Sequence, residues 1–225
     1  MDILTLIQAR QSSRGLFDPG RPLAEEDLRQ VLEAGRWAPT AHNMQNFEIV
    51  VVDDRRLLAA IGNIEYRISG DFVRENYEQL SFSEEELLEK KTGILATRFP
   101  PALRTPELAQ KMTTSLGKLV EDAPVLLIVL YDPGRRAPAS EDDFLGIISL
   151  GCVMENMWLT AAGLGIGFHV LSALAAVEDE VKRILNIPAR LRIAFSCRLG
   201  YPASPGYLRV RREVEDFTHR NRFSS

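Results

Sequence analysis

Arginine and hydroxyl side chains alternate in a short polar segment near the N-terminus. Arg10, Ser12 and Arg14 are spaced two residues apart, so in an extended segment they project to the same side. Two guanidinium groups and a hydroxyl suit a dianionic phosphate or a polarised ring carbonyl, because arginine donates to pairs of oxygen atoms in a planar fork. The segment therefore predicts an anion-binding loop, although a solvent-exposed loop would carry the same residues.

A second cationic pair lies near the other end of the sequence. Arg209 and Arg211 are again two residues apart, in a stretch that we expect to be extended. They could contact the same phosphate from the other side, or they could form a solvated surface. The functional interpretation depends mainly on both pairs meeting at one anion.

Three alternating glycines follow an apolar helical segment. Gly163, Gly165 and Gly167 resemble a dinucleotide-binding loop, but that motif needs a strand before the glycines and a helix after them. Here the helix comes first, so we reject that interpretation. We expect instead a helix end that lets the backbone pass near a flat group, with N–H groups of the next extended stretch, residues 169–173, bonding to it. A simple helix stop is the alternative.

Other reactive residues give little indication of chemistry. His42 and His169 have no nucleophile or carboxylate partner by spacing, and with His219 they are too scattered to form a metal cluster. Cys152 and Cys197 lie far apart in apolar segments, so we expect both to be reduced core residues. The usual hydrolase and phosphoryl-transfer motifs are missing. We predict no metal and no dedicated catalytic side chain.

Composition limits the class of protein. The chain has 225 residues, of which 45% are hydrophobic, enough for one packed domain. Its 27 basic residues against 31 acidic residues leave a net charge of −4, which argues against a nucleic-acid binder. We found neither a long uncharged apolar run nor a secretory leader, so we expect a cytoplasmic protein without a membrane span.

Apolar periodicity outlines the elements that must position these residues. It predicts helices over residues 3–9, 23–37, 144–162 and 177–186, and strands over 47–52, 125–131 and 191–199. In the last strand, Ser196 and Arg198 alternate with apolar residues, which predicts one buried face. We expect a single α+β domain over residues 1–225, with a small sheet between helices. The helix at 144–162 is apolar almost all round and should lie in a core or an interface.

Taken in order, these segments resemble the nitroreductase family of flavin mononucleotide (FMN) enzymes. The segment from Arg10 to Arg14 resembles the family's R-x-S-x-R, and residues 37–45, WAPTAHNMQ, resemble its W-A-P-S-x-x-N-x-Q loop. Further similar segments are the strand entry at 122–125, the helix end at 155–165, the closing strand at 199–202 and the C-terminal arm at 211–223. Only residues 53–121 find no match, and we expect them to form a variable substrate lid.

The resemblance implies a nitroreductase-like α+β fold. Its small central sheet would be mostly antiparallel and flanked by helices, and its long central helix would lie at the interface of a homodimer. The FMN phosphate would be held by Arg10, Ser12 and Arg211, helped by Arg209, with Gln11 in the same loop. Arg14 would face the flavin pyrimidine edge. The other implied contacts are a loop from the partner subunit with Pro39, Thr40, Ala41, Asn43 and Gln45, and the backbone of Val170, Leu171, Ser172 and Ala173.

The resemblance also implies an activity. NADH or NADPH would reduce the flavin, and a small acceptor such as a nitroaromatic compound or a quinone would then take its place in a ping-pong cycle. Two alternatives stay open. The unmatched segment at 53–121 could direct the same cofactor to reductive dehalogenation or to oxidation of a specialised metabolite. A chain that binds flavin only as a sensor is the second alternative.

Overall fold

The computed structural model describes residues 2–67, 113–140, 143–203 and 211–223, together with Glu85 and Glu89. The chain divides into two compact units, and the single domain expected from the sequence stays a prediction. The first unit combines Met1–Tyr66 with Ser115–Gly206, and the second combines Arg67–Thr114 with Tyr207–Ser225. The four-stranded sheet and the helices that flank it belong to the first unit.

The central sheet is antiparallel throughout, with the strand order β1-β4-β6-β5. Its members are β1 (Glu48–Val52), β4 (Val125–Tyr131), β6 (Arg192–Gly200) and β5 (Gly167–Val170). Strand β4 is buried along its length except at Tyr131, because its apolar run supplies side chains to both faces of the sheet. The predicted small antiparallel sheet is therefore confirmed.

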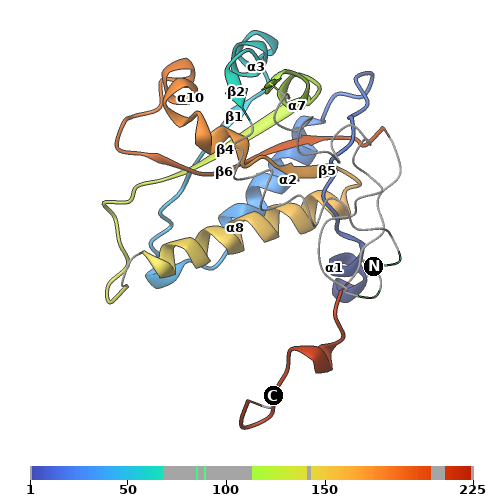
Figure 1. The fold of residues 1–225 in the computed structure, drawn as a ribbon, viewed down its shortest axis with the longest axis vertical. Coiled ribbons are helices and arrows are strands. Elements are labelled where there is room, and N and C mark those ends of the chain that lie inside the picture. The colour runs from blue at the N-terminus through green and yellow to red at the C-terminus, as the bar shows by residue number, and fades with distance from the viewer. Residues whose placement is uncertain are drawn as a thin grey trace. The chain divides into compact units, whose positions relative to one another are not determined.

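Helices cover both faces of this sheet (Figure 1). One face carries α8 (Phe144–Gly163) and α2 (Glu25–Arg36); the other carries α3 (Arg55–Gly62), α7 (Gly117–Glu121) and α10 (Glu178–Leu185). Each face has its own apolar core, since alternate residues of a strand point to opposite sides. Leu127 of β4 packs in the first core, and Leu126 and Ile128 pack in the second.

The remaining elements are short. They are α1 (Ile3–Ala9), η1 (Ala41–Asn43), β2 (Glu65–Arg67), β3 (Thr113–Ser115), α9 (Ala173–Ala176) and η4 (Val214–Asp216), with β2 and β3 forming a two-stranded sheet. At the ends of the segment predicted as a lid, Leu58 and Ile61 of α3 and Val120 of α7 are buried in the second core. Residues 68–112, apart from Glu85 and Glu89, lie outside the described residues, so a lid there stays a prediction.

Helix α8 ends as its glycines predict. The N–H of Ile166 donates to the carbonyl of Ala161 at 2.8 Å, and the N–H of Gly165 donates to that of Ala162 at 3.1 Å. This pair of bonds requires a left-handed residue after the helix, and Gly165 supplies it with φ of 72°. The turn leads directly into β5, so the helix end fixes where that strand begins.

One side of α8 is buried and another apolar side is not. Leu150, Val153 and Met157 pack in the first core, whereas Phe144 and Ile147 are 63% and 61% exposed. By length and composition alone α8 could also cross a membrane, a test that core helices of globular proteins pass as well. The prediction of a core helix is confirmed for one side, and an interface on the other side stays a prediction.

Strand β6 corrects one prediction. Ser196 and Arg198, assigned by alternation to an exposed face, are 0% and 1% exposed. The reason is that β6 lies between β4 and β5 and that both of its faces are covered in this part of the sheet. A buried arginine in the middle of a sheet needs polar partners, because an unpaired charge is costly to remove from water.

Candidate functional site

The loop from Arg10 to Gly15 lies against the edge strand β5. Ser12 forms a parallel bridge with Phe168, and the N–H of Ser13 donates to the carbonyl of Phe168 at 2.9 Å. At the start of the loop, Nε1 of Trp158 donates to the carbonyl of Gln11 at 3.0 Å. Strand β5 and helix α8 therefore hold the predicted anion-binding loop in place from two directions.

The buried guanidinium of Arg198 holds the other half of this loop. Its Nη2 donates to the carbonyls of Ser13, Arg14 and Gly15, at 3.4, 3.2 and 2.6 Å. These three oxygens replace water around the cation. The sequence interpretation missed this residue because alternation placed it on the surface, and no local signal distinguished it from an exposed strand residue.

His169 lies opposite Arg198 in the β5–β6 ladder. Nε of Arg198 donates to Nδ1 of His169 at 3.1 Å, so Nδ1 is an acceptor and the ring proton is on Nε2. Burial, followed by the positive charges of Arg198 and Arg14, lowers the pKa of His169 to about 3. The imidazole is therefore neutral near pH 7 and acts here as a partner of Arg198.

Two paired glycines make room for the end of the loop. Gly167 of β5 pairs with Gly200 of β6, and a Cβ atom at either position would lie 2.7 Å from the ring of Phe17. Phe17 is 2% exposed, and the guanidinium carbon of Arg198 lies 4.8 Å from the centre of its ring. The absence of side chains at these glycines is what lets Phe17 pack flat on the sheet.

Arg10 packs against two residues of α8. Its Nε lies 3.3 Å from Oε1 of Glu155, and its guanidinium carbon lies 4.5 Å from the centre of the Trp158 ring. The contact with Glu155 meets the distance of an ion pair but not the geometry of a hydrogen bond. Within the described part of the chain, this buried Nε has no hydrogen-bond partner. The Arg10 side chain is still 20% exposed, so the rest of its guanidinium can meet an incoming anion such as phosphate while Nε stays against Glu155.

The other predicted phosphate contacts fall into two groups. Gln11 and Ser12 are half-buried and Arg14 is exposed, all on the loop that β5 holds. Arg211 is exposed and belongs to the second unit, while Arg209 lies outside the described residues. The meeting of both arginine pairs at one anion therefore stays a prediction.

The loop between α2 and β1 has a strained backbone. His42, Asn43 and Gln45 have φ of 51°, 52° and 47°, in the left-handed region that residues other than glycine rarely adopt. Each such residue costs on the order of 1–2 kcal/mol. Strain of this kind persists where surrounding contacts enforce it, and it is concentrated at binding sites.

Hydrogen bonds inside and beneath this loop enforce its shape. The N–H of Ala41 donates to Oγ of Ser149 on α8 at 2.9 Å, and the N–H of Gln45 donates to the Thr40 hydroxyl at 3.1 Å. Nε2 of Gln45 donates to Oδ1 of Asn43 at 3.2 Å. The side chains predicted to reach a cofactor are thus gathered in one loop, with Pro39, Asn43 and Gln45 exposed.

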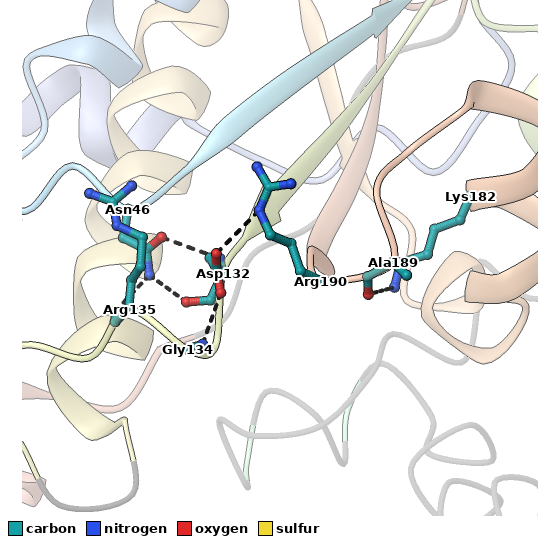
Figure 2. A network of polar contacts seen from close by, with 7 residues as sticks. All are labelled: Asn46, Asp132, Gly134, Arg135, Lys182, Ala189 and Arg190. Carbon is teal, nitrogen blue, oxygen red and sulfur yellow. Dashed lines mark hydrogen bonds and ion pairs between the residues drawn. The ribbon is translucent and has the colours of Figure 1, made fainter.

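Hydrogen bonds of Asn46 connect the end of this loop to the turn after β4 (Figure 2). Nδ2 of Asn46 donates to the carbonyls of Asp132 and Arg135, each at 2.9 Å, and its Oδ1 accepts the N–H of Asp132 at 3.2 Å. The Asp132 carboxylate lies 3.5 Å from Nε of Arg190, which ties the same turn to the start of β6. No role was expected for Asn46 from the sequence, and its polar side chain at the start of a strand was the available signal.

The extended stretch expected over residues 169–173 is shorter in the structure, because β5 ends at Val170 and α9 begins at Ala173. Leu171 donates its N–H to the carbonyl of Ser196 at 2.8 Å and accepts the Ser196 hydroxyl at 2.7 Å. Its polar backbone groups are therefore used within the sheet. Ser172 and Ala173 open α9, where the first N–H groups of a helix have no partner inside it.

The known proteins that this chain resembles are distant in sequence. A curated NADPH-dependent oxidoreductase of Staphylococcus aureus (strain USA300) is 22% identical over 205 residues, which cover 90% of this chain and 67% of that protein. A solved nitroreductase with bound FMN from Bacteroides fragilis has a TM-score of 0.63 and 20% identity, covering 97% of this chain and 98% of the other. Oxidized iodotyrosine deiodinase bound to FMN and 3-iodo-L-tyrosine has a TM-score of 0.64 and 21% identity, covering 99% and 100%.

The family is settled by a match along most of the chain. The model of the nitroreductase family aligns with residues 7–201. This range includes the loop from Arg10 to Gly15, the strained loop between α2 and β1, and the whole four-stranded sheet. On this match, and with the fold of its solved neighbours, the chain belongs to the nitroreductase family.

Proposed function

We propose that this protein is an FMN-dependent oxidoreductase that uses NADH or NADPH to reduce small acceptors such as nitroaromatic compounds and quinones. The observation that carries the proposal is the cationic loop from Arg10 to Gly15, which α8, β5 and β6 hold in place. FMN in the two solved neighbours and NADPH in the name of the curated relative support it.

Each part of the site has a role in this proposal. Arg10 and Ser12 bind the phosphate, and the positive charge of Arg14 lies beside the pyrimidine edge, where it favours an anionic reduced ring. The N–H groups of Ser172 and Ala173 orient the ring by hydrogen bonds. When bound, FMN would supply the hydride-transfer chemistry, so the side chains need only bind and orient. Reductant and acceptor then use the same site in turn.

The proposal includes a homodimer, with a second copy of this chain covering the exposed side of α8. Phe144, Ile147 and Ile148 are 63%, 61% and 47% exposed and lie within one turn of each other. Exposed apolar clusters of this kind mark association sites. The Thr40–Gln45 loop is bonded to Ser149 in the same half of α8, so pairing through this helix would bring the loop towards the partner's site.

The test begins with the purified protein and its visible absorbance spectrum. We expect a yellow protein with flavin bands and the mass of a dimer, which oxidises NADH or NADPH steadily when a nitrobenzoate or a benzoquinone is added. A protein that stays colourless after reconstitution with FMN would contradict the proposal. Tight FMN binding without turnover would favour the sensor alternative instead.

A second candidate is reductive dehalogenation, favoured by the match to iodotyrosine deiodinase over 99% of this chain. In this reaction an aryl iodide takes up two electrons and a proton, the carbon–iodine bond breaks, and iodide leaves. The photoreduced protein, mixed anaerobically with 3-iodotyrosine or with a nitrobenzoate, separates the two candidates. Reoxidation with stoichiometric iodide release, but none with the nitro compound, would replace the first candidate by the second.

A further inference from the structure

We propose that Arg198 and His169 form a positioning pair that holds the backbone of residues 13–15 in the shape that presents Ser12 and Arg14 to the cofactor. The inference rests on the proposed function for its cofactor, but the contacts that carry it lie within this chain. Neither residue needs to touch the cofactor. Both would act through the loop that does.

The loop does not have the shape of an extended strand. In an extended strand, successive carbonyls point in opposite directions. Here the carbonyls of Ser13, Arg14 and Gly15 all point to the same nitrogen, Nη2 of Arg198. The backbone must therefore curve around the guanidinium. A further bond, from the N–H of Arg14 to the carbonyl of Ser12 at 3.1 Å, tightens the same curve.

The guanidinium of Arg198 is itself oriented by neighbouring side chains. Arginine has a long side chain with many rotamers, so three carbonyls on one nitrogen do not fix its plane. The bond from Nε of Arg198 to Nδ1 of His169 adds a second point, 3.1 Å long and on another strand. The ring of Phe17, 4.8 Å away, adds a third. His169 thus sets the direction in which Nη2 meets the loop.

His169 keeps this role near neutral pH. An imidazolium has protons on both nitrogens and could not accept from Arg198. Burial and the neighbouring charges of Arg198 and Arg14 lower the pKa of His169, so the acceptor is retained at neutral pH. Arg198 is therefore always the donor and His169 always the acceptor, and their hydrogen bond connects β6, β5 and the loop.

The test compares two substitutions of one residue. His169→Asn keeps an oxygen near the position of Nδ1 and can accept from Arg198, whereas His169→Leu cannot. We expect the FMN dissociation constant of H169N to stay near the wild-type value and that of H169L to rise about tenfold, the size of one lost hydrogen bond to a charged group. Arg198→Lys, which cannot reach His169 and three carbonyls together, should also bind FMN more weakly.

A matched control separates positioning from stability. Val181→Ala removes a fully buried side chain of α10 in the second core, away from the loop. We expect it to lower stability but to leave the FMN dissociation constant unchanged. Equal dissociation constants for H169N and H169L, or an equal rise in V181A, would overturn the positioning role.

A second measurement does not need FMN. Hydrogen exchange of the Ser13 amide, which is bonded to Phe168, reports on the loop in the cofactor-free protein. We expect faster exchange in H169L than in H169N or V181A, and unchanged exchange in H169L would overturn the pair. If the wild-type protein binds no FMN, the proposed function fails, and this exchange measurement still decides whether the pair holds the loop.

Discussion

Arg10 is the residue on which cofactor binding should depend most directly. Arg10→Ala removes a charge-assisted contact with phosphate, so we expect FMN binding to weaken by about 1.5–3 kcal/mol. Fluorescence titration of the cofactor-free protein with FMN measures the change. Arg36→Ala, at an exposed arginine paired with Glu33 on α2, is the matched control and should bind FMN normally. Identical affinities of the two variants would refute the assignment of Arg10.

His169 makes the stability of the fold depend on pH. Its folded-state pKa of about 3 lies below the ordinary value of 6.5, so below pH 6.5 the unfolded chain takes up a proton that the folded chain does not. The stabilising contribution is complete above pH 6.5 and is lost as the pH falls towards 3. We expect the unfolding free energy to fall by about 2 kcal/mol between pH 7.5 and 5 because of this residue.

Urea denaturation at the two pH values tests this expectation. His169→Asn has no titrating group at the position and keeps a polar acceptor, so its loss of stability over the same interval should be smaller by that amount. The interval ends at pH 5 so that most carboxylates stay ionised in both states. A wild-type protein and an H169N variant with parallel pH dependence would show that His169 titrates normally.

Single residues also show what sequence patterns can and cannot predict. Arg10, Ser12 and Arg14 were identifiable because their alternation is local. The partners of that loop were not, because Trp158, Phe168 and Arg198 reach it only through the packing of α8, β5 and β6. Local spacing predicts which side chains could bind an anion, but only the fold selects the residues that hold them.

At the scale of elements, the loop between α2 and β1 stores strain that can be measured. His42 is exposed and has φ of 51°, a conformation that glycine adopts without steric cost. We therefore expect His42→Gly to raise the unfolding free energy by roughly 1 kcal/mol through the relief of strain. The larger conformational entropy that glycine gives to the unfolded chain reduces this gain. Arg29→Gly, at an exposed position inside α2, should instead lower it by about 1 kcal/mol.

Equilibrium unfolding in urea, with FMN removed, checks both variants. The contrast between the two substitutions matters more than either value, because both introduce the same residue at exposed positions. A loss of stability in His42→Gly as large as that in Arg29→Gly would mean that the loop is not strained at this residue.

Elements with strong local signals were predictable, and those defined by tertiary contacts were not. The helix at α8 and its glycine end follow from an apolar periodic run and a left-handed glycine, both local. The extended stretch expected up to Ala173 was too long, because its backbone turns into α9 after Leu171 pairs with Ser196. The burial of both faces of β6 depends on helices that are distant in sequence.

At the scale of the whole molecule, the exposed side of α8 predicts association. Ile147→Glu places a charge in the centre of that side, where desolvating it would be costly in an interface. We expect the variant to be a monomer by light scattering after gel filtration and to retain less FMN, since each site would lack its partner's loop. Leu57→Glu, at a 38% exposed position of α3 on the opposite face, should remain a dimer with FMN. A dimeric Ile147→Glu variant would exclude this surface.

The order of the strands depends on contacts between distant parts of the chain. The sequence indicated strands and helices in chain order, but the arrangement β1-β4-β6-β5 brings together segments that are separated by whole helices. Residue types along a single strand do not specify its neighbours, so pairing had to come from the family resemblance or from the structure. The resemblance supplied the fold, and the match over residues 7–201 confirmed it.

The guanidinium that holds residues 13–15 comes from residue 198, and this separation has a consequence for biosynthesis. A ribosome releases the cationic loop long before it releases β6, so for most of translation the loop has neither its central cation nor its neighbouring strand. Contacts between such distant parts of a chain form late in folding, after their long intervening loop has closed. The nascent chain should therefore acquire its prosthetic group only after synthesis is nearly complete.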